Sequence, residues 1–151
     1  MKKPRIYVDT SVFGGCYDDE FRDVSRKFFD LVKDGDFTIV VSRTTLDEIN
    51  EAPLRVQRIL GGLAVNSVEL FYGSESEIER LAKAYMDAGI IGCASAGDAI
   101  HIATATIAAV DFVVSWNFKH IVHYDKIQGY QAINLLGGYK PIDIYSPREV
   151  V

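Results

Sequence analysis

The fold is decided by one stretch near the start of the chain, Ile6-Tyr7-Val8-Asp9-Thr10-Ser11-Val12-Phe13-Gly14-Gly15. A short apolar run ends abruptly at a carboxylate and two hydroxyls, and paired glycines follow. This pattern predicts a buried strand whose carboxyl end presents Asp9, with a break at the glycines. In open α/β sheets, ligands bind outside the carboxyl ends of the strands, so an acid in this position is a candidate site residue.

Beyond this stretch, strand-like and helix-like segments alternate along the chain. Further strands are predicted over residues 37–41, 65–71, 112–115 and 142–145. Helices are predicted over residues 21–33, 54–63, 74–88, 98–110 and 125–136, with a further short helix that carries Glu48. The alternation predicts an α/β fold in which helices cover both faces of a mostly parallel central sheet, and we expect a single domain over residues 1–151.

The bulk composition excludes several classes of protein. The chain has 151 residues, 48% of them hydrophobic, which argues against disorder, and its formal net charge of −5 argues mildly against a nucleic-acid binder unless basic residues gather locally. Cys16 and Cys93, the two cysteines, form neither a zinc-binding spacing nor a disulfide framework. No secretory signal and no apolar run of about 20 residues is present, so we expect a cytoplasmic protein that does not enter membranes.

Asp9 and Glu48 each allow two interpretations. Asp9 follows a strand, where it is either a site carboxylate or a loop aspartate that binds nearby backbone amides. Glu48 stands three residues after Thr45, as in a capping box, where a glutamate binds back to the amide of the capping residue. The helix of Glu48 follows directly from the second strand, however, which places its first turns near the same sheet edge as Asp9.

Asp98 and Asn117 also stand where strands end or helices begin. Asp98 opens the most apolar helix of the chain, either as an N-terminal cap or as a carboxylate held at the mouth of a buried helix. Asn117 follows the fourth strand, either as a turn residue or as a site residue that offers its carbonyl oxygen to a metal or its amide to a phosphate.

These four positions can meet at the carboxyl edge of a parallel sheet. Three carboxylates there repel one another, by about 4 kcal/mol for each pair about 4 Å apart at an effective dielectric constant near 20. Proton uptake or a bound cation must offset this repulsion. Ligands that are all oxygen atoms favour Mg²⁺ or Mn²⁺ over zinc.

The pattern resembles the PIN domain family, in particular its small VapC-like toxins. The resemblance rests on Val8-Asp9-Thr10-Ser11, on Glu48, on Gly97-Asp98-Ala99-Ile100-His101-Ile102-Ala103-Thr104-Ala105 and on Ser115-Trp116-Asn117-Phe118. It implies a PIN-like three-layer α/β/α fold and metal-dependent cleavage of single-stranded RNA. It also implies a homodimer and a co-encoded antitoxin protein that blocks the site.

The resemblance assigns Asp9, Glu48 and Asp98 as ligands of Mg²⁺ or Mn²⁺ and Asn117 as an auxiliary group. Many family members carry a fourth acid at the position of Asn117. The asparagine puts a second metal in doubt. It also keeps open a catalytically weak or inactive PIN-like module that binds RNA or protein.

Other side chains have supporting parts in this interpretation. Thr10, Ser11 and Ser115 are expected to orient the carboxylates, as hydrogen-bond donors behind metal ligands do. His101, one turn into the apolar helix, is expected to be a hydrogen-bonded core residue. Four basic side chains that flank the strand ends are candidates for RNA contacts: Arg22, Arg43, Lys119 and His120.

A different Mg²⁺-dependent phosphohydrolase is a further alternative. A haloacid-dehalogenase-like phosphatase also places an aspartate after its first strand, but it needs a second acid two residues later, where this chain has Ser11. A response-regulator-like receiver needs paired acids near the first strand, which are absent here.

Overall fold

A computed structural model describes residues 2–151 of the chain. Its centre is a five-stranded sheet with the order β3-β2-β1-β4-β5, in which every pair of neighbouring strands is parallel. The strands are β1 (Arg5–Val8), β2 (Thr38–Ser42), β3 (Val68–Phe71), β4 (Phe112–Val114) and β5 (Asp143–Tyr145). The predicted α/β class is confirmed, and the sheet is entirely parallel.

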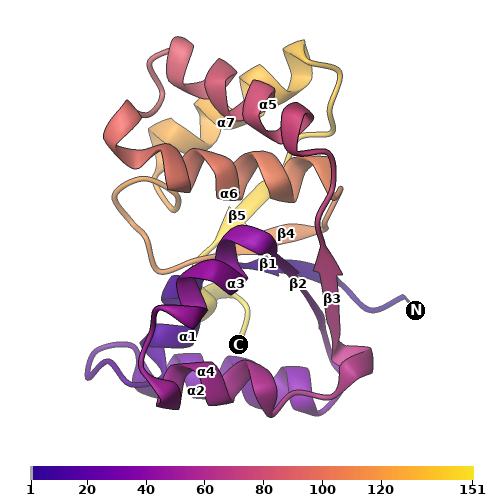
Figure 1. The fold of residues 1–151 in the computed structure, drawn as a ribbon, viewed down its shortest axis with the longest axis vertical. Coiled ribbons are helices and arrows are strands. Elements are labelled where there is room, and N and C mark those ends of the chain that lie inside the picture. The colour runs from indigo at the N-terminus through magenta and orange to yellow at the C-terminus, as the bar shows by residue number, and fades with distance from the viewer. Residues whose placement is uncertain (1) are drawn as a thin grey trace.

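Helices cover the sheet on both faces (Figure 1). One layer holds the first four helices: α1 (Thr10–Gly15), α2 (Arg22–Lys33), α3 (Arg43–Asn50) and α4 (Leu54–Gly61). The other layer holds α5 (Glu75–Asp87), α6 (Ala96–Ile107) and α7 (Tyr124–Leu136). Among the residues that the structure describes, no helix is long and apolar enough to cross a lipid bilayer.

Side-chain alternation along the central strand creates the two layers. Ile6 and Val8 of β1 enter the core beneath α1 to α4, whereas Tyr7 enters the core beneath α5 to α7. Successive residues of a strand point to opposite faces, so a strand buried on both sides needs an almost continuous apolar run. Tyr7 therefore carries a hydroxyl group into a buried layer, where it needs a partner.

The strand order places a crevice at the carboxyl end of β1. The chain passes from β1 to β2 and β3 on one side and returns to β4 and β5 on the other side. Such a reversal of direction opens the carboxyl edge beside the first strand. Asp9 follows β1 at this edge, and α6 begins at the same edge because it runs back toward the start of β4.

Two local predictions were wrong. The paired glycines do not break the chain but lie inside α1. Gly15 is needed there for close packing, because a Cβ atom would lie 2.5 Å from Ser25 Oγ and 2.8 Å from Trp116 Nε1. In addition, residues 65–67 of the predicted third strand form a short 3₁₀ helix, Val65–Ser67, before β3 begins.

Candidate active site

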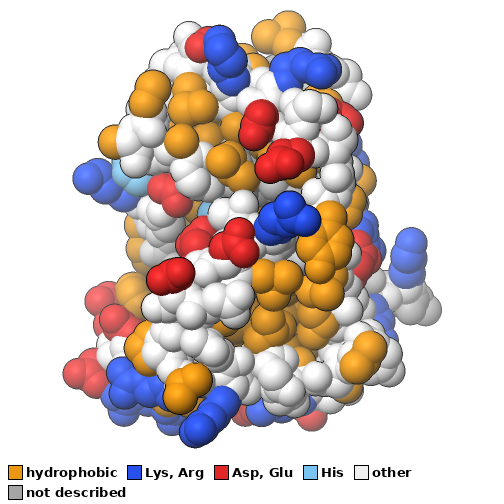
Figure 2. All heavy atoms as spheres, viewed as in Figure 1, with side chains coloured by type: hydrophobic (Ala, Val, Ile, Leu, Met, Phe, Trp, Pro, Cys, Tyr) orange, Lys and Arg blue, Asp and Glu red, His pale blue; other side chains and the backbone are white. Residues whose placement is uncertain are grey.

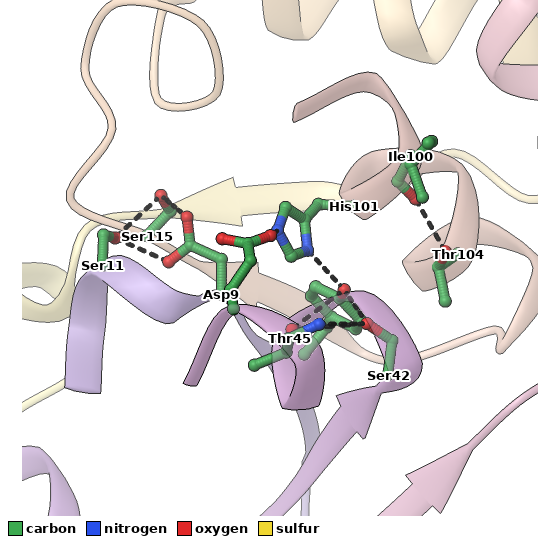
Figure 3. Close-up of polar contacts among 10 residues, drawn as sticks. Asp9, Ser11, Ser42, Thr45, Ile100, His101, Thr104 and Ser115 are labelled. Atoms are coloured by element: carbon green, nitrogen blue, oxygen red, sulfur yellow. Dashed lines mark hydrogen bonds and ion pairs between the residues drawn. The ribbon is translucent and has the colours of Figure 1, made fainter. Parts of the chain in front are cut away.

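The carboxylate of Asp9 is buried at the carboxyl end of β1, with 4% of the residue exposed. Ser11 Oγ donates a hydrogen bond of 2.6 Å to Oδ1, and Ser115 Oγ donates one of 2.7 Å to Oδ2 (Figure 3). Ser11 comes from the first turn of α1 and Ser115 follows β4. The carboxylate is thus held by hydroxyl groups of two elements, and it does not cap α1 with its side chain. The loop interpretation of Asp9 is therefore wrong.

The protonation of Asp9 reflects this burial. Burial raises the pKa of Asp9, and the negative charge of Asp98 raises it further. The charge of His101 and the hydrogen bonds from Ser11 and Ser115 act in the opposite direction but do not outweigh burial. The raised pKa means that the ionised form of Asp9 is costly in the folded protein, and a nearby cation would stabilise it.

Glu48 takes part in a chain of hydrogen bonds that crosses the site. Its Oε1 atom lies 2.7 Å from His101 Nε2, and His101 Nδ1 lies 2.6 Å from the Tyr7 hydroxyl. The Tyr7 hydroxyl in turn lies 2.8 Å from Ser42 Oγ. In Figure 3, His101 extends from α6 toward Asp9 on one side and toward Ser42 and Thr45 on the other.

The charges of His101 and Glu48 depend on each other. Burial alone would lower the pKa of His101, but its interaction with Tyr7, the hydrogen bond to Glu48 and the charge of Asp9 raise the pKa to about 10. Burial alone would raise the pKa of Glu48, but the hydrogen bond and charge of His101 lower it. The raised pKa of His101 and the lowered pKa of Glu48 both favour an imidazolium bound to a carboxylate.

The capping-box interpretation of Glu48 is wrong. The N-cap of α3 is Ser42, whose Oγ accepts a hydrogen bond of 3.2 Å from the Thr45 backbone N–H. Thr45 is therefore inside the helix and buried, and it leaves no free amide for Glu48 to cap. Glu48 lies in the second half of α3 with 44% of its side chain exposed.

Asp98 is half-buried in the first turn of α6. The N-cap position of this helix is Ser95, so of the two alternatives for Asp98 the N-terminal cap is wrong. Asp98 and His101 are three residues apart and therefore share one helix face. That face carries both the carboxylate whose charge raises the pKa of Asp9 and the histidine that binds Glu48. Figure 2 shows acidic side chains gathered at mid-height on this side of the molecule, beside a histidine.

Asn117 and Thr10 differ from what the sequence led us to expect. Asn117 Oδ1, the atom expected to serve as an auxiliary ligand, accepts hydrogen bonds from the backbone N–H groups of Lys119 and His120 at 3.2 Å and 2.9 Å. The asparagine thus orders the turn after β4. Thr10 Oγ1 is buried without a hydrogen bond of good geometry, although it lies close enough to Glu48 to help lower its pKa.

The basic residues expected to contact RNA differ in their surroundings. Arg22 pairs with Asp19 at 2.5 Å, and Arg43 lies over the Tyr72 ring at 5.6 Å. His120 Nε2 lies 3.1 Å from Ser95 Oγ, at the start of α6. Lys119 is exposed beside the turn of Asn117.

The donor chemistry of the site fits a hard divalent cation. Asp9 is buried, bears a raised pKa and lies within the field of Asp98, so it would gain from a positive charge. Within residues 2–151, however, no three Asp, Glu, His or Cys side chains are placed together as a group that could hold a metal ion. His101 binds Glu48 through Oε1, so Oε2 is the oxygen that would bind a shared ion.

The expectation that His101 is a hydrogen-bonded core residue is confirmed, but the sequence alone missed Tyr7 and the contacts through which both residues act. Both are nearly or fully buried, and together they link β1, α3 and α6. Two signals point to them in retrospect. Tyr7 is a hydroxyl-bearing residue within a buried strand, and His101 lies three residues after Asp98 in a helix that is otherwise mostly apolar.

Comparison with known structures shows where this arrangement belongs. VapBC2 from Rickettsia felis bound to a DNA fragment from their promoter superposes with a TM-score of 0.59 at 15% identity, over 94% of this chain and 98% of that chain. FitAcB from Neisseria gonorrhoeae gives 0.57 at 15% identity, over 95% and 98%. FitAB bound to an IR36 DNA fragment gives 0.58 at 15% identity, over 94% of each chain. These likenesses concern the fold.

The sequence comparison is more specific. No curated protein matches the chain in sequence. The family model described as the PIN domain matches residues 5–119, which include Asp9, Glu48, Asp98 and Asn117. That span is well over half of the chain, and it runs from β1 through the turn after β4. The chain therefore belongs to the PIN domain family.

Proposed function

We propose that the protein is a metal-dependent ribonuclease that cleaves single-stranded RNA at the carboxyl edge of its sheet. The observation that carries this proposal is the state of Asp9, a buried carboxylate beside the charge of Asp98 whose ionised form is disfavoured. Keeping Asp9 ionised in such a site costs free energy of folding, and a bound cation would offset this cost. Membership of the PIN domain family supports the same chemistry.

In this proposal Asp9, Asp98 and Glu48 hold Mg²⁺ or Mn²⁺. The ion would supply Lewis acidity for hydrolysis of a phosphodiester, by lowering the pKa of water and neutralising charge on the phosphate. Ser11 and Ser115 hold Asp9 in a single orientation through its two oxygens. Asn117 orders the turn beside the site, and the exposed Lys119 on that turn is a candidate for contacts with the RNA phosphates.

The proposal extends to the setting in which the protein acts. We infer a toxin that functions in the cytoplasm as a homodimer of single-domain subunits, each formed by residues 1–151. We also infer a co-encoded antitoxin that blocks the site. The solved structures of similar fold support this setting, because they are of VapBC2, FitAcB and FitAB, and two of them hold DNA.

Two observations favour a second candidate, a PIN-like module that binds RNA or protein without cleaving it. In the described residues 2–151, the acids are not grouped as a ready metal site, and Asn117 replaces the acid that many family members carry. A binding module would retain the fold and the surface but would not turn over a substrate.

An assay with purified protein separates the two candidates. A 5′-labelled single-stranded RNA is incubated with the protein in Mn²⁺, in Mg²⁺ and in EDTA, and a single-stranded DNA of the same sequence is run in parallel. We expect cleavage of the RNA that needs the metal and stops in EDTA. Binding of intact RNA in all conditions favours the module, and preferential cleavage of the DNA contradicts the choice of RNA.

A further inference from the structure

We propose that His101 is a positioning residue of this site, which anchors the Glu48 carboxylate so that it can share one divalent cation with Asp9 and Asp98. The inference rests on the proposed function for the presence of a cation. It assigns to His101 a part beyond that of a buried core residue. The histidine itself would not touch the ion or the RNA.

The hydrogen-bond chemistry fixes the direction of the contact between His101 and Glu48. An ionised carboxylate can only accept hydrogen bonds, so His101 Nε2 must carry the proton that joins it to Glu48 Oε1 at 2.7 Å. The other ring nitrogen is bonded to the Tyr7 hydroxyl at 2.6 Å. Because both nitrogens have partners and only 3% of the residue is exposed, the ring has one orientation.

The residue that orients the histidine is itself immobile. Tyr7 is fully buried in β1, and its hydroxyl also contacts Ser42, the N-cap residue of α3. The hydrogen-bonded chain therefore runs from the sheet to α6 and ends on Glu48 in α3. The two aspartates stand near members of this hydrogen-bonded chain in the sequence, since Asp9 is two residues after Tyr7 and Asp98 is three residues before His101.

Glu48 needs such an anchor more than Asp9 does. Asp9 is buried and held by two serine hydroxyls, whereas 44% of the Glu48 side chain is exposed. Repulsion from neighbouring carboxylates would favour rotation of an unanchored Glu48 into solvent. Partners of metal ligands that act in this way typically change metal affinity by about 10- to 100-fold when removed.

Two substitutions of His101 test the anchor because they differ in reach. In His101→Asn the amide takes the place of Nδ1, so it can contact Tyr7 but cannot reach Glu48. In His101→Gln the longer side chain brings an N–H donor to the place of Nε2. The buried neighbour Ile102 provides a packing control, Ile102→Val, in the same helix.

Mn²⁺ affinity is measured by isothermal titration calorimetry on each folded variant. We expect His101→Asn to bind Mn²⁺ about 10- to 100-fold more weakly than the native protein. His101→Gln should recover much of the loss, and Ile102→Val should bind as the native protein does. Equal affinity in all four proteins would overturn the proposal, and so would equal weakening in His101→Asn and His101→Gln.

A second measurement tests the anchor without metal. The urea midpoints of His101→Asn, Glu48→Ala and the double variant form a double-mutant cycle. Non-additive shifts support the anchor, and additive shifts overturn it. If the native protein binds no Mn²⁺, the proposed metal dependence fails, and this cycle alone then decides whether His101 anchors Glu48.

Discussion

Replacing Tyr7 with phenylalanine isolates one hydroxyl group at the centre of the site. The ring is fully buried in β1, and phenylalanine fills the same volume, so Tyr7→Phe opens no cavity. The substitution removes the contacts of 2.6 Å to His101 Nδ1 and 2.8 Å to Ser42 Oγ. Ser42 keeps its hydrogen bond from the Thr45 backbone, whereas Nδ1 of the buried His101 loses its one short partner.

The expected loss of stability follows from this difference. Leaving a buried polar group without a partner costs about 1–3 kcal/mol. The charge carried by His101 places the cost in the middle of that range or above it, so we expect Tyr7→Phe to lower the free energy of unfolding by about 2 kcal/mol. For a chain of this length, that corresponds to a fall in Tm of about 4–8 °C.

Urea unfolding followed by circular dichroism measures the effect. Tyr72→Phe is the matched control, because Tyr72 is 52% exposed and its hydroxyl lies outside the site. The control should change the free energy of unfolding by less than about 0.5 kcal/mol. If Tyr7→Phe were as neutral as Tyr72→Phe, the bond between Tyr7 and His101 would contribute nothing, and the account of the buried chain would be refuted.

Three further predictions concern α1, Asp9 and the proposed metal. Gly15→Ala should destabilise the protein by about 1–3 kcal/mol, because its Cβ would crowd Ser25 and Trp116. In Gly14→Ala the added Cβ meets no atom within 4 Å, so this variant should be neutral or stabilised by up to about 1 kcal/mol. Similar thermal midpoints for Gly14→Ala and Gly15→Ala would contradict this difference. Because burial raises the pKa of Asp9, the stability that its protonated form contributes is fully present below its usual pKa of 3.8 and is lost as pH rises through the raised value. In metal-free buffer, Asp9→Asn should therefore lose less stability than the native protein as the pH rises. If the free energies of unfolding of the native protein and Asp9→Asn change with pH in parallel, the prediction is wrong. Mn²⁺ should stabilise the native protein, by about 2.7 kcal/mol at 100 times its Kd.

Much of the fold could be predicted from residue patterns. Continuous apolar strands alternating with amphipathic helices indicate a parallel sheet covered on both faces, and the structure has this architecture. The position of Asp9 at a strand end also followed from the pattern. The helical conformation of Gly14 and Gly15 did not, because glycine signals a break in the chain as readily as a close approach between helices.

The contacts within the site were harder to predict because they depend on three-dimensional partners. Thr45 and Glu48 have the spacing of a capping box, yet Ser42 occupies the N-cap and releases Glu48 for His101. Asn117 has the chemistry of a metal ligand, yet nearby backbone amides engage its carbonyl oxygen. In both cases a local sequence pattern has two uses, and the register of the helix or turn decides between them.

The most direct test of the central claim compares RNA cleavage by the native protein and by Asp98→Asn in Mn²⁺. Asp47→Asn is the control, because Asp47 is an exposed acid next to Glu48 on α3. We expect Asp98→Asn to stay folded but to lose cleavage, whereas Asp47→Asn should cleave at the native rate. Cleavage by Asp98→Asn at the native rate would contradict the assignment of these carboxylates as the metal site.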